Sequence, residues 1–260
     1  MSLLSVRDLS VRFGGLAAVN GLAFDVEQGE IVSIIGPNGA GKTTAFNLIT
    51  GMYRANHGQV LLAGRDLVGL AANQITAAGL ARTFQNIRVF PEMSVLDNVL
   101  VGAHSRLSTG PLGAIIRTPR VKRQERAARE RALELLGLFG ERLVPRRNDM
   151  AMSLSYANRR RTEIARALAS DPKVLLLDEP AAGMNPSETR EITQQIAAIR
   201  ARGFTILLIE HDMHVVMTIS DRVVVMDHGT KIAEGLPRDI ANDARVIEAY
   251  LGHRAVAAGA

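Results

Sequence analysis

The chain has 260 residues, of which 47% are hydrophobic and 22% are charged, a composition typical of a folded protein with a sizeable core. The absence of cysteine excludes a disulfide scaffold and fits a reducing compartment, and no apolar run approaches the roughly 18 residues of a membrane helix, so we expect a soluble protein. The net charge is +5, and the stretch 117–131, with seven basic and two acidic residues, carries the same excess, which excludes a generally cationic surface.

The N-terminal part of the chain predicts strands around one glycine-rich loop. Arg7 and Asp8 come too early for the apolar region of a signal peptide. The β-branched run at 31–35 has the pattern of a fully buried strand. A helix after the loop is closed by Gly51. We expect strands at 3–13, 31–35 and 58–64, a strand within 21–30 that ends in a Gly-Glu turn, and a helix at 42–51.

The rest of the chain alternates helices with buried strands, apart from one helical block. Residues 94–140 are helical in character, with a break near 110–119. The further helices are expected at 156–169, 187–202, 212–219 and 243–251. The further strands are expected at 173–180, at 204–209 and on both sides of the Asp-His-Gly turn within 222–235.

This alternation predicts an α/β protein with a mostly parallel sheet, and no internal repeat is visible. The helix-only block at about 90–170 interrupts the alternation, and we interpret it as an inserted helical subdomain. We expect one domain over 1–253, with a short C-terminal extension at about 237–253. Residues 254–260 are expected to form a disordered tail.

The segment "GPNGAGKT" at 36–43 matches the phosphate-loop pattern G-x-x-x-x-G-K-[ST], with a buried strand before it and a helix after it. Glycines let the backbone wind closely around phosphate oxygens, and successive N–H groups point at the anion. Lys42 is expected to reach the β- and γ-phosphates, and Thr43 is expected to bind Mg²⁺. A glycine-rich turn with a chance lysine is the alternative.

Two acids end the second buried strand, "VLLLDEP". Asp178 lies at the carboxyl end of that strand, the position of an aspartate that holds Mg²⁺. Glu179 is adjacent and can orient and polarise a water for attack on the γ-phosphate. The alternative is a strand end with two solvated acids, which the preceding phosphate loop disfavours.

These two motifs and four more resemble those of the ATP-binding cassette (ABC) transporter ATPases, over almost the whole chain. "LSYANRRRTEIARAL" lies where that family carries its signature sequence, a short distance before the acidic strand. "RTFQ" supplies Gln85 at the position of the glutamine loop, and "LLIEHDM" supplies His211 at the switch histidine. Phe13 falls where the family stacks an aromatic ring on adenine. Each motif alone is weak, but six in the right order are specific.

The resemblance implies a P-loop NTPase fold with a mixed, mainly parallel core sheet, an antiparallel β subdomain and the helical insert. It implies ATP and Mg²⁺ as cofactors, catalytic roles for Glu179, His211 and Gln85, and metal binding by Thr43, Gln85 and Asp178. Gln85 can equally be a surface residue, His211 a structural one, and Phe13 an ordinary core residue. The implied ATP-binding residues are Phe13, Gly36, Pro37, Asn38, Gly39, Ala40, Gly41, Lys42, Thr43 and Thr44.

The resemblance also implies a pair of such chains that enclose two ATP molecules. Ser155, Tyr156, Ala157 and Asn158 would contact the ATP bound to the partner, and Asn185 would take a dimer-contact position. Ala157 stands where the family has glycine, and Asn158 where glutamine is usual. Because the methyl group of Ala157 adds bulk at a close approach and resists a positive φ, we expect a weakened signature.

Within this family, "EPAAGMNPSET", the terminal "VIEAYLG" and the longer helical insert resemble the ATPase subunit of branched-chain amino acid importers. This resemblance implies two transmembrane permease subunits, a homo- or heterodimeric ATPase pair and, indirectly, an extracytoplasmic substrate-binding protein. It places the chain in the cytoplasm, peripheral on the inner face of the cell membrane. Permease helices are expected to dock near 85–101, where Phe90 and Met93 offer an apolar contact.

Other functions remain open at this point. The ATPase of lipopolysaccharide export is the nearest relative that also fits, and a regulatory subunit with little turnover is a further possibility. A non-transport ABC ATPase acting on nucleic acid or ribosomes would use the basic run 117–131. That run has no interleaved aromatic residue, which argues against a base-stacking platform. A solvated helix face or binding to anionic headgroups explains the run equally well.

Overall fold

The structure is a computed structural model that describes residues 2–106 and 118–251. The strands are β1 Leu4–Phe13, β2 Leu16–Val26, β3 Ile31–Ile35, β4 His57–Leu62, β5 Arg65–Asp66, β6 Leu80–Arg82, β7 Val174–Asp178, β8 Thr205–Ile209, β9 Arg222–Asp227 and β10 Thr230–Gly235. The α-helices are α1 Lys42–Ile49, α2 Ala72–Ala78, α3 Val95–Gly102, α5 Pro119–Gly137, α6 Tyr156–Leu168, α7 Pro186–Ala201, α8 Met213–Ile219, α9 Pro237–Ile240 and α10 Ala244–Leu251. Short 3₁₀ turns lie at Ala103–Arg106, Gly140–Arg142 and Ala151–Ser153.

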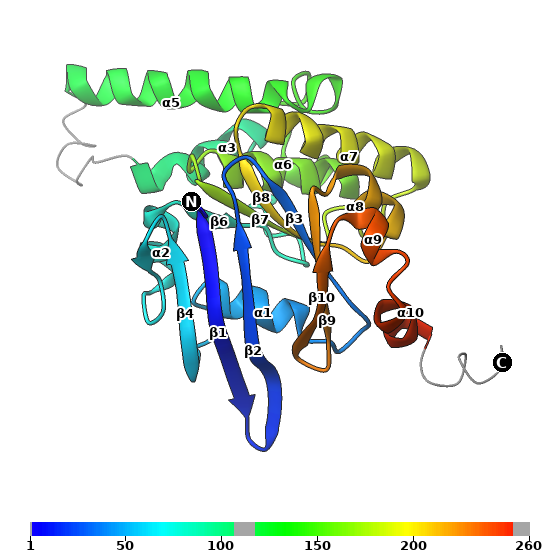
Figure 1. Cartoon of the computed structure of the whole chain (residues 1–260). Coiled ribbons are helices and arrows are strands. Elements are labelled where there is room, and N and C mark those ends of the chain that lie inside the picture. The colour runs from blue at the N-terminus through cyan, green and yellow to red at the C-terminus, as the bar shows by residue number, and fades with distance from the viewer. Residues whose placement is uncertain (1, 107–117, 252–260) are drawn as a thin grey trace.

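The central sheet of the described residues has six strands in the order β10-β9-β3-β8-β7-β6 (Figure 1). The strands from β9 to β6 are parallel, and β10 pairs antiparallel with β9. The phosphate loop follows β3, which lies between β9 and β8, and the acidic motif follows β7. Because β3, β8 and β7 run in the same direction, the loops after them meet at one edge of the sheet.

A second sheet of four strands, β2-β1-β4-β5, is wholly antiparallel and lies beside the central sheet (Figure 1). Helix α1 lies between the two sheets, and its Phe46 and Ile49 belong to the same core cluster as Leu4 of β1 and Leu176 of β7. This cluster joins the antiparallel subdomain to one face of the central sheet.

The other face of the central sheet carries α3, α5, α6 and α7 (Figure 1). The strands contribute alternate residues to the two faces, as the period-2 geometry of a strand requires. Leu175 and Leu177 of β7 pack against this helical layer, whereas Val174 and Leu176 pack against α1. Both faces are therefore covered, which is why the parallel strands are continuous apolar runs.

The predicted fold class is confirmed by this mixed sheet, the antiparallel sheet and the helices. Helices α3, α5 and α6 lie between β6 and β7 in the chain, which is the segment interpreted as an insert. The strand expected from Gly21 begins earlier, at Leu16, and it ends at Val26, before the expected Gly-Glu turn. The sequence did not predict α2 and β6. The expected break near 110–119 falls largely, and the tail at 254–260 entirely, outside the described residues.

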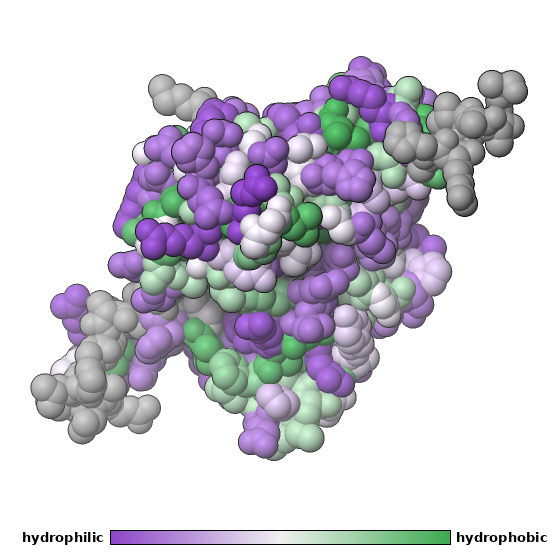
Figure 2. Space-filling model, turned by 90° about the horizontal axis from the view of Figure 1, so that it is seen from below, coloured by the Kyte–Doolittle hydropathy of each residue, from purple (hydrophilic) through white to green (hydrophobic). Residues whose placement is uncertain are grey.

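The described surface mixes polar and apolar side chains. Seen from below, hydrophobic patches are separated by hydrophilic side chains (Figure 2). The described part of the basic run lies on α5, where Val121, Ala132 and Leu135 face the core and Arg126 pairs with Glu130 on the exposed side. Among residues 2–106 and 118–251, no helix combines the length and the apolar character that a bilayer span requires.

Candidate functional site

The phosphate loop is shaped by glycines in conformations that other residues rarely adopt. Gly36, Gly39 and Gly41 have φ values of 149°, 83° and 95°. A Cβ atom at Gly36 would lie 2.0 Å from the carbonyl oxygen of Met226, and one at Gly41 would lie 2.5 Å from that of Ala18. Substitution at either glycine would therefore displace a neighbouring backbone segment.

Lys42 opens α1 and is buried beneath this loop. Its Nζ donates hydrogen bonds to the carbonyl oxygens of Gly36 at 2.6 Å and Pro37 at 3.0 Å. Burial lowers the pKa of Lys42, and the nearby carboxylates of Glu179 and Asp178 oppose that shift. The remaining predicted loop residues are Ala40, which is buried, Pro37 and Thr44, which are half-buried, and Asn38 and Thr43, which are exposed.

Asp178 ends β7 and is 1% exposed. Its Oδ2 accepts a hydrogen bond from Nη2 of Arg82 at 2.7 Å, whereas its Oδ1 is buried and has no hydrogen-bond partner. Burial raises the pKa of Asp178, and the hydrogen bond from Arg82 opposes that effect. An unpaired buried carboxylate oxygen is costly and is a recognised feature of sites that bind an ion.

Glu179 has a φ of 47°, a left-handed conformation that is strained for a non-glycine residue. Its Oε2 accepts a hydrogen bond from Nε2 of Gln85 at 3.2 Å and lies 3.9 Å from Nδ1 of His211. The three residues predicted to be catalytic come from segments far apart in the sequence. The structure brings all three together around one carboxylate oxygen.

Phe13 lies at the end of β1 and is 48% exposed, so the alternative that it is an ordinary core residue is wrong. It makes an edge-to-face contact with Tyr53, with the ring centroids 5.3 Å apart. Tyr53 is also exposed and was not identified from the sequence. The two rings form a small aromatic surface of the kind that stacks on a base.

The signature segment begins helix α6, and Ser155 is its N-cap. The Ser155 hydroxyl accepts a hydrogen bond from the amide of Asn158 at 3.4 Å, so it satisfies a backbone donor of its own helix. The ring of Tyr156 lies against Gly183 in the loop after Glu179. Within the described residues, no hydrogen bond joins 155–158 to the phosphate loop of the same chain.

Ala157 is 2% exposed, and its backbone is helical. The methyl group was expected to add bulk at a close approach to a phosphate, but in this chain it is covered by the chain's own residues, which argues against such a clash. The helix does not need a positive φ at this position either, and that removes the predicted strain. The substitution of alanine for glycine is compatible with an intact helix start.

A buried ion pair that was not identified from the sequence joins α6 to the segment carrying Gln85. Nη1 of Arg160 lies 2.9 Å from Oε2 of Glu163, and both side chains are almost completely buried. Arg160 also donates to the carbonyl oxygens of Phe84 and Gln85. Glu163 Oε1 accepts from the amides of Phe84 and Arg88. We call these two side chains the α6 clamp; their sequence spacing of three residues was the only available signal.

Glu210 is a second missed residue, although it lies inside the recognised motif "LLIEHDM". It is 0% exposed, and its carboxylate accepts hydrogen bonds from the amides of Ala181, His211 and Asp212. Burial raises the pKa of Glu210, and these three amides oppose the shift. Glu210 thereby connects the loop after Glu179 to the loop that carries His211.

Asn185 was expected at a dimer contact. In the structure it is the N-cap of α7, and its Oδ1 accepts from the amides of Ser187 and Glu188 at 3.0 Å each. Its position after the catalytic loop therefore has a local explanation, and the dimer contact stays a prediction.

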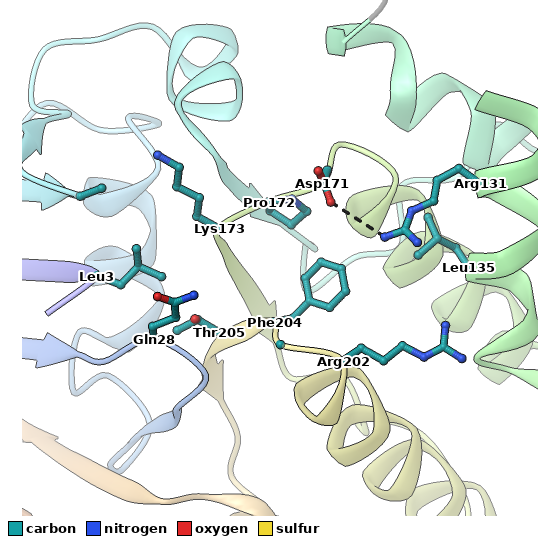
Figure 3. Close-up of a pocket in the computed structure, with 12 residues that line it drawn as sticks. Leu3, Gln28, Arg131, Leu135, Asp171, Pro172, Lys173, Arg202, Phe204 and Thr205 are labelled. Atoms are coloured by element: carbon teal, nitrogen blue, oxygen red, sulfur yellow. Dashed lines mark ion pairs between the residues drawn. The ribbon is translucent and has the colours of Figure 1, made fainter. Parts of the chain in front are cut away.

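A cavity of about 570 Å³ lies at the opposite edge of the sheet, where β7 and β8 begin (Figure 3). Leu135, Pro172 and Phe204 line its apolar part, and Arg131 lies 3.9 Å from Asp171 at one side. It contains none of the residues predicted to bind ATP. Ligands of parallel α/β sheets bind at the carboxyl ends of the strands, where Lys42, Asp178 and Glu179 meet.

Comparison with known proteins agrees with this geometry. The sequence pattern of the ABC transporter family matches residues 19–182, and that of the branched-chain amino acid ATP-binding cassette transporter matches residues 230–256. The high-affinity branched-chain amino acid transport ATP-binding protein LivG of Escherichia coli (strain K12) is 49% identical over 96% of this chain and 98% of its own length. LivG of Salmonella typhimurium is 48% identical over the same shares.

A solved structure supports the same relationship. The ADP conformation of an ATP-binding cassette of an ABC transporter has a TM-score of 0.83 and 32% sequence identity to this chain. It covers 97% of this chain and 100% of its own.

Proposed function

Because the chain belongs to the ABC transporter family of ATP-binding proteins, we propose that it hydrolyses ATP to drive an importer of branched-chain or related amino acids. The observation that carries the substrate class is the match of residues 230–256 to a pattern of branched-chain amino acid transporters. The 49% identity to an ATPase of such a transporter over nearly the full length supports import over the alternatives of lipopolysaccharide export or nucleic acid binding.

The phosphate loop binds the triphosphate of ATP. Lys42 exchanges the carbonyl oxygens of Gly36 and Pro37 for phosphate oxygens, and its burial makes the charge interaction stronger than in water. The amides that open α1 and the adjoining loop contribute further donors. Phe13 and Tyr53 offer the aromatic surface on which the adenine stacks.

Mg²⁺ fits the donors at this edge of the sheet. The described residues contain no group of three or more His, Cys, Asp or Glu side chains that could enclose a metal. Mg²⁺ bound with a nucleotide needs few protein ligands, because phosphates and waters fill the remaining positions. Asp178 Oδ1 is a buried oxygen without a partner, and Thr43 and Gln85 supply neutral oxygens. When bound, Mg²⁺ neutralises charge on the phosphates.

Glu179 acts as the general base. Its carboxylate orients a water, takes one of its protons as the water oxygen bonds to the γ-phosphorus, and the bond from that phosphorus to the β–γ bridging oxygen breaks. The hydrogen bond from Gln85 to Glu179 Oε2 supports this arrangement because it orients the carboxylate, and Nδ1 of His211 lies 3.9 Å from the same oxygen. Gln85 also precedes the helical insert, so its position can report the presence of the γ-phosphate to that insert.

The chain works as one of a pair of ATPases, either identical or different, with two permease subunits and an extracytoplasmic substrate-binding protein. The start of α6, where Ser155 caps the helix, faces the ATP bound to the partner. The chain lies in the cytoplasm, where the permease holds it at the inner face of the membrane. The names of its relatives, which are transport ATP-binding proteins, support this assembly.

Hydrolysis is tested by comparing Glu179→Gln with Glu141→Gln, a change of an exposed acid far from the site. We expect Glu179→Gln to bind ATP normally and to lose about 100-fold or more of its hydrolysis rate, because the base is removed and the phosphate loop is intact. Lys42→Ala should instead lose ATP affinity. Undiminished hydrolysis by Glu179→Gln would remove the catalytic role of Glu179.

The transport function is tested by co-purification of the chain with its partners from the native membrane, followed by reconstitution. We expect ATP-dependent uptake of leucine, isoleucine or valine that is lost with Glu179→Gln in the ATPase. Co-purification with partners that move no amino acid would overturn the proposed substrate.

The permease contact is tested by crosslinking, since the chain has no cysteine of its own and single cysteines give clean signals. Phe90 is 46% exposed beside Met93, within the expected docking segment 85–101. Phe90→Cys and Met93→Cys should crosslink to the permease, whereas Leu236→Cys, which is equally exposed elsewhere, should not. Consistent failure at Phe90 and Met93 would exclude this docking site.

A further inference from the structure

Arg82 is a buried guanidinium that connects the strand before Gln85 to two parts of the ATP site. Its side chain is 6% exposed. Nη2 donates to Oδ2 of Asp178 at 2.7 Å, and Nη1 donates to Oδ1 of Asn47 at 2.6 Å and to Oγ1 of Thr50 at 3.2 Å. One side chain therefore joins the end of β7 to α1, the helix that begins with Lys42.

Two aromatic rings restrict where this guanidinium can move. Its central carbon lies 5.5 Å from the ring centroid of Phe46 and 5.2 Å from that of Phe84. Both distances are within the range of a cation–π contact. The rings keep water away from the ion pair, and a guanidinium that is weakly hydrated tolerates such a setting better than an ammonium group.

The contact makes the two oxygens of Asp178 different. Oδ2 is occupied by Arg82, and Oδ1 is buried without a hydrogen-bond partner. Rotation about χ2 changes the direction in which an aspartate presents its carboxylate oxygens, unless one of the two oxygens is held. The planar fork of Arg82, itself fixed by Asn47 and Thr50, holds Oδ2 in place.

We propose that Arg82 is a positioning residue, which holds Asp178 by Oδ2 and thereby keeps Oδ1 available to the Mg²⁺ that accompanies ATP. This role rests on the proposed ATPase function. It gives Arg82 no contact with the nucleotide. Partners that orient a metal-binding side chain commonly change metal affinity by about 10- to 100-fold when they are removed.

Arg88 offers a matched control. Its guanidinium carbon lies 4.2 Å from the centroid of the same Phe84 ring, yet no interaction links it to Asp178 among the described residues. Loss of a cation beside Phe84 can thus be separated from loss of the contact with Asp178. Arg82→Met keeps the aliphatic stem and removes all donors, and Arg82→Lys keeps the charge and removes the fork.

The experiment measures binding of a non-hydrolysable ATP analogue, adenylyl imidodiphosphate, to the full chain in EDTA and across a Mg²⁺ titration. We expect wild type and Arg88→Met to bind the analogue more tightly as Mg²⁺ is added, with equal midpoints. Arg82→Met should need about tenfold more Mg²⁺, with an affinity in EDTA within about twofold of wild type. Arg82→Lys should lie between them, as a partial rescue.

The outcomes separate the positioning role from the ATPase function itself. A wild-type Mg²⁺ midpoint in Arg82→Met, or in Arg82→Lys if the methionine variant does not fold, overturns the role of Arg82. An equal loss of affinity with and without Mg²⁺ also overturns it, because Arg82 would then support the phosphate loop in general. A wild-type chain that binds no nucleotide overturns the proposed function instead.

Discussion

The ion pair Arg82–Asp178 and the α6 clamp, Arg160–Glu163, lie on either side of residues 83–88 and are similarly buried, but they use their carboxylates differently. Both oxygens of Glu163 accept hydrogen bonds, and the two Nη groups of Arg160 donate to Glu163 and to the backbone carbonyls of Phe84 and Gln85, while its Nε has no partner. Asp178 keeps one oxygen unpaired.

This difference distinguishes an ion pair that holds the backbone from one that leaves an oxygen available for a ligand. A buried pair whose carboxylate oxygens both accept hydrogen bonds fixes neighbouring backbone, and here it ties the signature helix to the residues around Gln85. In the other pair, the unpaired Oδ1 of Asp178 is the oxygen that we propose for Mg²⁺. The four predictions below test this distinction, in order of decreasing expected effect.

Glu163→Ala should break the α6 clamp and destabilise the protein most. It leaves the guanidinium of Arg160 buried without its carboxylate, which typically lowers the free energy of unfolding by about 3–5 kcal/mol. Urea denaturation measures the effect. Glu130→Ala on α5, which removes a pair that is largely exposed, is the control and should change stability by less than about 1 kcal/mol. Equal effects of the two changes would show that the clamp is not structural.

The double variant Arg160→Met/Glu163→Leu should recover much of that stability, because no buried charge remains. It also removes the donors and acceptors that hold the backbone of Phe84, Gln85 and Arg88. We expect ATP hydrolysis to fall on the order of tenfold through misplacement of Gln85, with ATP affinity nearly unchanged. A steady-state assay measures both. Full activity would mean that the clamp does not position Gln85.

Ala157→Gly tests the helix start that precedes the clamp by one turn. Because Ala157 is buried in a helical backbone, glycine should lower stability by up to about 1 kcal/mol and should not raise the hydrolysis rate. Thermal unfolding and a hydrolysis assay, side by side, measure the two effects. A clear rise in rate would restore the idea that the alanine methyl obstructs a phosphate.

Glu191→Gln tests a partly exposed ion-pair cluster, for comparison with the two buried pairs. In this cluster Glu191 pairs with Arg142 and Arg161. The hydrogen bond from Arg142 lowers the pKa of Glu191 from its ordinary 4.5, so its stabilisation is present above that value and is lost as pH falls through the lowered one. We expect a loss of about 1 kcal/mol or less at pH 7. Unfolding of both proteins over a series of pH values from 7 down to 2 measures this, and a difference that does not shrink as the pH falls would contradict it.

Much of the architecture was predictable because its signals are local. Sequence patterns alone predict the buried strands 31–35 and 173–180. They also predict the glycine-rich loop between strand and helix. β6 has three residues, too few for any periodicity, and it was missed together with Arg82 at its end. A strand this short is defined by the strand with which it forms hydrogen bonds, which here is β7.

The candidate site was less predictable where its contacts join distant positions. Arg82 and Asp178 are separated by 96 residues, and the sequence around each residue does not predict that the two side chains pair. The direction of the Ala157 side chain depends on which face of α6 packs against the core, and a motif of five residues cannot supply that. Exposure of Phe13 likewise follows from its place at the end of β1 rather than from its residue type.

Glu210 joins two loops of the candidate site. Its three hydrogen bonds, to the amides of Ala181, His211 and Asp212, fasten two loops that lie on neighbouring strands. A relative movement of the loop after Glu179 and the loop that carries His211 would therefore have to break the buried hydrogen bond from the amide of Ala181 to Glu210. Gln85, by contrast, is joined to Glu179 by a single side-chain hydrogen bond of 3.2 Å, so a movement of the segment that leads into the helical insert would break one contact with these two loops.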